Sequence, residues 1–303
     1  LYHTYGKIRE MLKKFIKQLK RHSVRNLTVF FLSCGLVMAS ILLIWASTFK
    51  IPSLDTIEER KISQSTKIYD NTGKILLYDV FDKAKRTIVP IENISPYIKD
   101  ATISIEDKDF YTHNGFKPTS FIRAIIANAL SGEYSQGGST ITQQVVKNSI
   151  LTGTKSFLGG PVRKLKEIVL AMKLNGTISK EQVLSMYLNE NPYGGAIYGV
   201  EEASQTFFGK PASEVTLAEA AYLAALPQAP AYFSPYGSHK EQLDNRKNLV
   251  LGEMHKDGKI STEEYQNALQ EEVLFIPKTN TGIKAPHLVM YIKEYLEKKY
   301  GAD

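Results

Sequence analysis

A chain of 303 residues is long enough for one sizeable domain with accessory segments, and 43% hydrophobic and 23% charged residues are typical of a globular protein. The net charge of +7 comes entirely from residues 1–26, which hold eight Lys or Arg residues and one acid, Glu10. The rest of the chain is neutral, which argues against a general nucleic-acid binder. The single cysteine, Cys34, excludes an intrachain disulfide.

The first predicted element is an uncharged apolar run over residues 27–49. As a helix it is long enough to cross a hydrocarbon core of about 30 Å. It is too long for the apolar core of a cleaved signal peptide, and a helix buried in a protein core is the other alternative. Because cytoplasmic flanks are rich in Lys and Arg, the basic segment 1–26 predicts a cytoplasmic N-terminus and an extracytoplasmic remainder. Part of that segment, 7–25, also has the pattern of an amphipathic helix on anionic lipid.

A stem is expected over residues 50–90, with a β-hairpin where two apolar runs flank the turn Asn71–Gly73. The pattern then becomes helical, which predicts a mainly α domain over 91–275. Residues 276–303 are expected to form a connector that ends in a helix. Four capping signals mark the helix starts in the domain, namely Ser95 before Pro96 and three capping boxes that begin at Ser179, Thr216 and Ser261.

Glu106 is the first candidate for chemistry, because it emerges at the end of an apolar helix. Ile98 and Ile105 lie two turns apart and anchor that helix in a core. A carboxylate held at such an edge is partly removed from water, which raises its pKa and suits a general base. The alternative is a solvated Glu106–Asp107 pair at a helix end.

A polar stripe is predicted on the helix that opens after Gly137-Gly138. Its members recur at i, i+3, i+4 and i+7: Thr140, Gln143, Gln144 and Lys147. The glycine entry leaves backbone N–H groups that can meet an anion. The Gly-Lys-Ser/Thr ending of a nucleotide-binding loop is missing. An ordinary solvated helix face is the alternative.

A third helix places Arg163, Lys166 and Glu167 on one face, away from an apolar stripe. Two cations beside a carboxylate can bind a diphosphate, either directly or through a divalent metal at Glu167. The alternative is an i, i+4 ion pair at the surface, which contributes only a few tenths of a kcal/mol.

Five segments occur in order along the chain: EDKDFYTHNG (106–115), GGSTITQQ (137–144), RKLKE (163–167), YLNENPYGG (187–195) and LAALPQAP (223–230). Together they resemble the five signature motifs of the family 51 glycosyltransferases. These are the peptidoglycan polymerases found in class A penicillin-binding proteins and in monofunctional enzymes. The resemblance covers most of the chain after the apolar run and implies a lysozyme-like, mainly α fold with a larger head and a smaller membrane-facing jaw.

The resemblance implies that the substrates are lipid II, a disaccharide-peptide on undecaprenyl pyrophosphate, and a growing glycan chain. Glu106 would be the base that takes the proton of the acceptor 4-hydroxyl in a single inverting displacement. Glu167 would be the second essential carboxylate, organising the pyrophosphate with a Mg²⁺ or Mn²⁺ ion. The substrate-binding residues carried over by motif are Asp107, Thr140, Gln143, Gln144, Lys147, Lys155, Arg163, Lys164, Lys166 and Asn189.

Alternatives to a polymerase stay open at the level of the sequence. A lysozyme-like hydrolase would share the fold and one catalytic Glu, but it would not need the cations of 163–166 or a membrane anchor. A non-enzymatic scaffold for cell-wall synthesis proteins would not need Glu106. Residues 286–300 resemble the linker before a transpeptidase domain, so the chain is either part of a bifunctional enzyme or monofunctional. The implied location is the outer face of a bacterial cytoplasmic membrane, in contact with membrane lipid.

Overall fold

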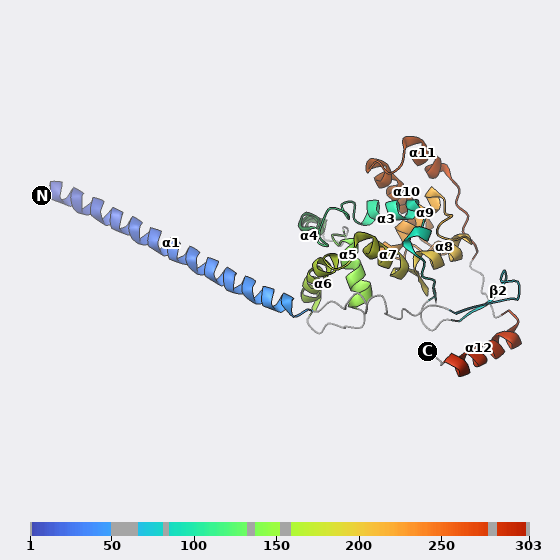
Figure 1. Cartoon of the computed structure of the whole chain (residues 1–303). Coiled ribbons are helices and arrows are strands. Elements are labelled where there is room, and N and C mark those ends of the chain that lie inside the picture. Colours follow the sequence, from blue (N-terminus) through green and yellow to red (C-terminus); the bar gives the residue numbers. More distant parts are fainter. Residues whose placement is uncertain are drawn as a thin grey trace. The chain divides into compact units, whose positions relative to one another are not determined.

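The computed structural model describes residues 2–49, 66–80, 85–131, 137–151, 159–277 and 284–300. The chain forms two units, Leu1–Ile51 and Pro52–Asp303. The first unit consists of one helix, α1 (Tyr2–Ser47), which contains most of the apolar run and confirms that it is helical (Figure 1). Within the described ranges, no helix has an apolar stretch of the length and hydropathy needed to cross a bilayer.

The expected hairpin is confirmed at the start of the second unit. Strands β1 (Thr66–Tyr69) and β2 (Leu76–Val80) pair antiparallel. Their turn is stabilised by Asp70, whose Oδ1 accepts the Ile75 N–H at 3.0 Å. Gly73 takes a φ of +70°, which glycine adopts without steric cost.

The described part of the second unit is otherwise mainly helical, as predicted. In chain order the helices are η1 (Ile91–Asn93), α3 (Pro96–Glu106), α4 (Pro118–Ser131), α5 (Ile141–Val145), the π-helix η2 (Val146–Ile150), α6 (Gly159–Asn175), α7 (Lys180–Glu190), α8 (Val200–Phe208), α9 (Leu217–Ala225), η3 (Leu226–Gln228), α10 (Lys240–Lys256), α11 (Thr262–Gln270) and α12 (Pro286–Tyr300).

A small three-stranded sheet was not predicted from the sequence. In it, β5 (Ile197–Tyr198) lies between β3 (Lys85–Arg86) and β4 (Pro192–Gly194). The β3–β5 pair is parallel and the β4–β5 pair is antiparallel. Strands of two or three residues are too short to carry a periodic pattern, so sequence reasoning had no signal for them.

Four helices, α3, α7, α9 and α11, begin where the capping signals predict. The Ser95 side chain caps α3, and the boxes that begin at Ser179, Thr216 and Ser261 are complete. In each box, two side-chain oxygens accept hydrogen bonds from two backbone N–H groups, one in the first turn and one at the cap residue. A fourth box, not predicted, begins at Thr140 and opens α5.

The centre of the domain is α9, whose nine residues are all buried. It packs against α3 and α10, which also contact each other (Figure 1). Five of the nine residues of α9 are alanine, so its backbone can approach its neighbours closely. This three-helix core fixes the C-terminal end of α3, where Glu106 lies.

Candidate active site

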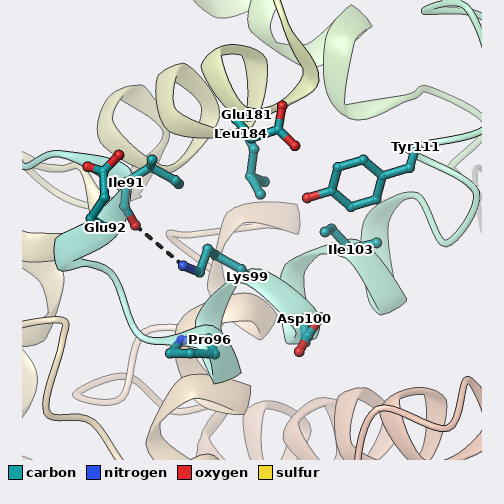
Figure 2. A pocket seen from close by; sticks show the side chains of 9 residues that line it. All are labelled: Ile91, Glu92, Pro96, Lys99, Asp100, Ile103, Tyr111, Glu181 and Leu184. Carbon is teal, nitrogen blue, oxygen red and sulfur yellow. Dashed lines mark hydrogen bonds between the residues drawn. The ribbon is translucent and has the colours of Figure 1, made fainter.

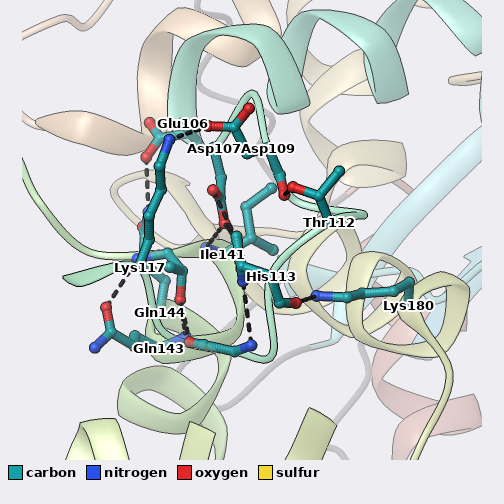
Figure 3. Close-up of polar contacts among 12 residues, drawn as sticks. Glu106, Asp107, Asp109, Thr112, His113, Lys117, Ile141, Gln143, Gln144 and Lys180 are labelled. Atoms are coloured by element: carbon teal, nitrogen blue, oxygen red, sulfur yellow. Dashed lines mark hydrogen bonds and ion pairs between the residues drawn. The ribbon is translucent and has the colours of Figure 1, made fainter. Parts of the chain in front are cut away.

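Glu106 is the last residue of α3, and its side chain is 14% exposed. Its Oε2 accepts a hydrogen bond from Gln144 Nε2 of α5 at 2.7 Å (Figure 3). Its Oε1 lies 3.9 Å from Nη2 of Arg246 on α10. Burial raises the pKa of the Glu106 carboxyl; the Gln144 hydrogen bond and the Arg246 charge oppose that rise, and the Asp107 charge adds to it. The carboxylate is therefore partly desolvated and oriented toward α5.

Two buried tyrosines lie close enough to Glu106 for its charge to affect their pKa values. Tyr187 of α7 and Tyr193 of β4 are each 2% exposed. Burial is the main cause that raises the pKa of both hydroxyls, and the Glu106 charge adds to it. Both side chains therefore stay neutral near pH 7. Among the described groups that act on the Glu106 pKa, Arg246 and Asp107 are the charged ones.

Asp107 links the loop after α3 to the start of α5. One of its carboxylate oxygens lies 2.8 Å from His113 Nε2 and accepts the Ile141 N–H at 3.0 Å (Figure 3). His113 Nδ1 accepts the Gly115 N–H at 3.1 Å. The neutral ring is therefore assigned its proton on Nε2, which donates to Asp107. The structure thus gives Asp107 a positioning contact at the site predicted to bind substrate.

Gly115 ends that loop in a conformation that requires glycine. Its φ is +81°, and a Cβ at this position would lie 2.4 Å from the Ala171 carbonyl oxygen of α6. Thr140 Oγ1 donates to the Gly115 carbonyl at 2.7 Å. The loop that follows Glu106 is therefore seated between the cap of α5 and the body of α6.

The polar stripe predicted over residues 140–147 is divided in the structure. Thr140 and Gln143 form the capping box of α5 and are only 2% and 1% exposed, so both side chains serve the cap. Gln144 reaches Glu106, whereas Lys147 is exposed in the π-helix η2. Lys147 lies in the π-helix η2, where the 3.6-residue period on which the stripe was predicted no longer holds.

Glu167 is the buried carboxylate of α6, at 3% exposure. Its Oε2 lies 3.2 Å from Lys164 Nζ, and its Oε1 lies 3.6 Å from Arg163 Nε. Lys164 also donates to Ser139 Oγ at 2.6 Å, which joins α6 to the entry of α5. The predicted cluster of cations around Glu167 is present, although the ion pairs are with Arg163 and Lys164. Lys166 lies half-buried on the same helix.

The site offers little protein ligation for a metal ion. In the described ranges, no group of three or more His, Cys, Asp or Glu side chains is arranged to hold one. Glu167 supplies a single carboxylate next to two cations. This donor set suits a Mg²⁺-type ion that is bound mainly by phosphate oxygens and water, and it does not suit an all-protein cage.

Asn189 of α7 holds the end of the stem. Its Oδ1 accepts the Val89 N–H at 3.0 Å, and its Nδ2 donates to the Val89 carbonyl at 3.0 Å. The same Nδ2 also donates to the Ser185 carbonyl at 3.0 Å. The Asn189 side chain is buried, and it hydrogen-bonds the backbone of the stem and of α7. Lys155, the last of the predicted binding residues, lies outside the described residues.

Sequence reasoning missed Arg246. The signal available for it was a cation at a core position of α10: Arg246 lies three residues after Leu243 and four before Val250, and both of those are fully buried. A cation at such a position needs a partner, because Arg is almost never buried unpaired. Nothing in the sequence identified Glu106 as that partner.

A separate pocket of about 280 Å³ lies along another part of α3 (Figure 2). It is lined by Lys99 and Ile103 of α3 and by Leu184 of α7, among others, and Lys99 Nζ donates to the Ile91 carbonyl at its edge. None of the predicted site residues lines it. The candidate active site is therefore the surface around Glu106, α5 and α6.

Comparison with known proteins gives the same assignment as the five motifs. The transglycosylase family matches residues 74–255. The chain is 37% identical to penicillin-binding protein 1A of Aquifex aeolicus, over 88% of this chain and 36% of that protein. It is 35% identical to penicillin-binding protein 1A of Neisseria flavescens, over 89% of this chain and 33% of that protein. The chain thus spans about a third of the length of these relatives.

A solved structure of penicillin-binding protein 1A from Haemophilus influenzae matches 80% of this chain and 25% of its own, with a TM-score of 0.45 and 23% identity. From the family match and the curated relatives, the chain belongs to the transglycosylase family, the family 51 glycosyltransferases. Its matched region is homologous to the transglycosylase region of the penicillin-binding proteins 1A.

Proposed function

We propose that this chain polymerises lipid II into β-1,4-linked glycan strands and releases undecaprenyl pyrophosphate. Membership of the transglycosylase family supports the reaction class. The observation that carries the proposal is the partly desolvated Glu106 carboxylate, held by Gln144 at 2.7 Å, at the first of the five motifs.

In the proposed reaction, Glu106 accepts the proton of the acceptor sugar's 4-hydroxyl as that oxygen attacks the anomeric carbon of the lipid-linked donor. The new C–O bond forms on the face opposite the pyrophosphate, the anomeric C–O bond to the pyrophosphate breaks, and the configuration inverts. A base with a raised pKa accepts a proton more readily, and a positioned base contributes about 10²–10⁴-fold to the rate.

The leaving pyrophosphate needs positive charge where its own charge develops. In the proposal this charge comes from Arg163 and Lys164, which flank Glu167, together with Lys166 and the exposed Lys147. A Mg²⁺ or Mn²⁺ ion, when bound with the diphosphate, would be held by Glu167 and would neutralise phosphate charge.

The lipid-linked substrate implies work at a membrane. We propose that residues 1–26 are cytoplasmic, that 27–49 span the bacterial cytoplasmic membrane, and that the stem (50–90), the catalytic domain (91–275) and the connector (276–303) lie outside the cell's cytoplasm. The basic segment before the apolar run supports this orientation.

The test uses the full chain, labelled lipid II and three proteins: wild type, Glu106→Gln and Glu272→Gln. Wild type and Glu272→Gln, which alters an exposed carboxylate, are expected to make polymer ladders. Glu106→Gln is expected to lose at least about 10²-fold in rate with an unchanged circular dichroism spectrum.

Polymerisation by Glu106→Gln at the wild-type rate would contradict the mechanism and favour a scaffold. Shortening of preformed glycan by the wild type, without polymer, would instead indicate a hydrolase.

A further inference from the structure

We propose that α1 pairs in parallel with the α1 helix of a second copy of this chain. The helix runs without a break from Tyr2 to Ser47 (Figure 1). Along it, one set of residues recurs at alternating spacings of three and four, which is the seven-residue period of a coiled coil. With the seven positions of each repeat written a to g, the a and d positions form the seam: Tyr5, Ile8, Leu12, Phe15, Leu19, His22, Asn26, Val29, Ser33, Leu36, Ser40, Leu43 and Ser47.

The positive charges of the basic segment fall mainly away from the seam. Arg9 and Arg25 lie beside it, at e and g positions. The other cations of residues 1–26 take b, c and f positions, which lie on the outside of a helix pair: Lys7, Lys13, Lys14, Lys17, Lys20 and Arg21. From Tyr5 to Leu19 the seam itself consists of apolar and aromatic residues. Two copies can therefore approach along the seam while most of their like charges lie apart and are screened by salt.

A stripe of this kind can also lie flat on a lipid surface, but the continuity of α1 argues against that arrangement. A helix that lay on the membrane and then crossed it would need a sharp bend, which occurs at proline, at Gly/Ser pairs or at π-bulges. The helix contains no proline and continues through Arg25 and Asn26 as a regular α-helix.

The length of the basic half also favours a protein partner over lipid. With residues 27–49 in the membrane, as we propose, the helix from Asn26 back to Tyr5 extends about 30 Å beyond it. Anionic lipid attracts exposed charge over only about 8 Å at physiological salt. Most of the apolar stripe then lies too far from the membrane to be covered by lipid, so it needs a protein surface.

The polar positions of the seam identify a second copy as the partner. Asn26 takes an a position, where a single asparagine fixes the register of two parallel helices. The later a positions all hold serine: Ser33, Ser40 and Ser47. Small residues let helices approach closely in a membrane. The d residues Val29 and Leu36 are 57% and 71% exposed in this chain. In an identical helix in the same register, each asparagine and serine meets its own counterpart.

Cysteine cross-linking tests the seam in the full chain, in vesicles of phosphatidylethanolamine and phosphatidylglycerol. Cys34, at a b position, is first replaced by serine. His22→Cys at d and Ser40→Cys at a are the seam variants. Val24→Cys and Met38→Cys, at f positions two residues away, are the matched controls. Under mild oxidation the seam variants are expected to form disulfide-linked dimers much faster, because only the seam brings two Cα atoms within the about 7 Å that a disulfide spans.

A second experiment weakens the seam and measures the dissociation constant by sedimentation equilibrium in detergent. The double variant Leu12→Ser with Leu19→Ser is expected to raise this constant at least about tenfold, because two large apolar side chains leave the seam of each helix. The control, Lys13→Ser with Lys20→Ser, places serine one residue further on in the same repeats and should not weaken pairing. Added salt should strengthen wild-type pairing by screening the basic segments, whereas it would weaken binding to anionic lipid.

Equal cross-linking at the seam and at the outer positions would overturn the inference, as would an unchanged dissociation constant in the leucine variant. A mass of three or more chains would overturn the pairing of two helices. If circular dichroism shows that the leucine variant has lost helix, the cysteine pairs decide. The inference goes beyond the proposed reaction, and none of these measurements uses polymerisation. A wild-type chain that makes no polymer would therefore contradict the proposed function alone.

Discussion

At the scale of single residues, the burial of Glu106 affects both its basicity and the stability of the folded protein. Its burial raises the pKa of the carboxyl above the ordinary value of 4.5, which favours proton uptake from a substrate. The same shift disfavours the charged form in the folded protein. Because the folded pKa is raised, the stability linked to protonation of Glu106 is fully present below the unfolded pKa and is lost as pH rises through the folded pKa.

Glu106→Gln is therefore expected to raise the melting temperature at pH 7, even though the same change is expected to slow polymerisation strongly. Glutamine resembles the protonated carboxyl and is uncharged at every pH, so the advantage should shrink as the pH falls toward 4. Thermal unfolding followed by circular dichroism across this pH range measures the difference. A melting temperature below that of the wild type at pH 7 would show that Glu106 stabilises the fold.

Residue patterns predicted part of the site. Glu106 at the end of an apolar helix and the cations around Glu167 could be placed from spacing and from the five motifs. The contact between Glu106 and Arg246 could not, because it joins residues 140 positions apart in the chain and depends on how α3 packs against α10. Sequence spacing indicates which residues are neighbours within one helix. It does not indicate which residues of two packed helices face each other.

At the scale of elements, capping was the most predictable feature. The caps at Ser95, Ser179, Thr216 and Ser261 were all read from short local patterns, since a cap involves residues only two or three positions apart. The box at Thr140 has the same local form. From the sequence alone this box is hard to tell from a substrate-binding stripe, because a polar stripe and a cap share the same residue types.

The Thr140 cap is expected to matter more than an exposed one, because α5 carries Gln144. Thr140→Ala removes the cap and the hydrogen bond to Gly115, so a loss of about 1–3 kcal/mol in unfolding free energy and a clear loss of polymerisation are expected. Ser261→Ala at the exposed start of α11 should cost about 0.5–1 kcal/mol and leave polymerisation unchanged. Denaturant unfolding and lipid II assays on both variants measure this.

Equal losses of activity in the two variants would show that the α5 cap has no special connection with the site. Loss of stability in Thr140→Ala with full activity would show that Gln144 keeps its place without the cap.

At the scale of the whole molecule, the stem is joined to the domain by side chains as well as by the short sheet. Glu202 of α8 accepts from Lys67 of the hairpin at 2.7 Å and from Thr87 at 2.9 Å. Asn189 holds both backbone groups of Val89. These contacts join residues 100 to 135 positions apart, so sequence reasoning, which treated residues 50–90 as a separate stem, could not foresee them.

Asn189→Ala is expected to release Val89 while the helical core persists. Amide hydrogen exchange at Val89 should become much faster, because its N–H loses its acceptor, whereas exchange in α9 should hardly change. Hydrogen exchange with residue-level resolution checks both parts. Unchanged protection at Val89 would mean that β3 alone holds this segment.

The contacts of Glu202 and Asn189 with the stem have a mechanical consequence. The stem precedes α3 in the chain, and α3 carries Glu106 at its far end. A pull on the stem from the N-terminal side meets Glu202 and Asn189 first, so the force passes into α8 and α7 before it can reach α3. Tension on the chain ahead of the domain would therefore be borne by these two helices, and the position of the Glu106 carboxylate would be preserved.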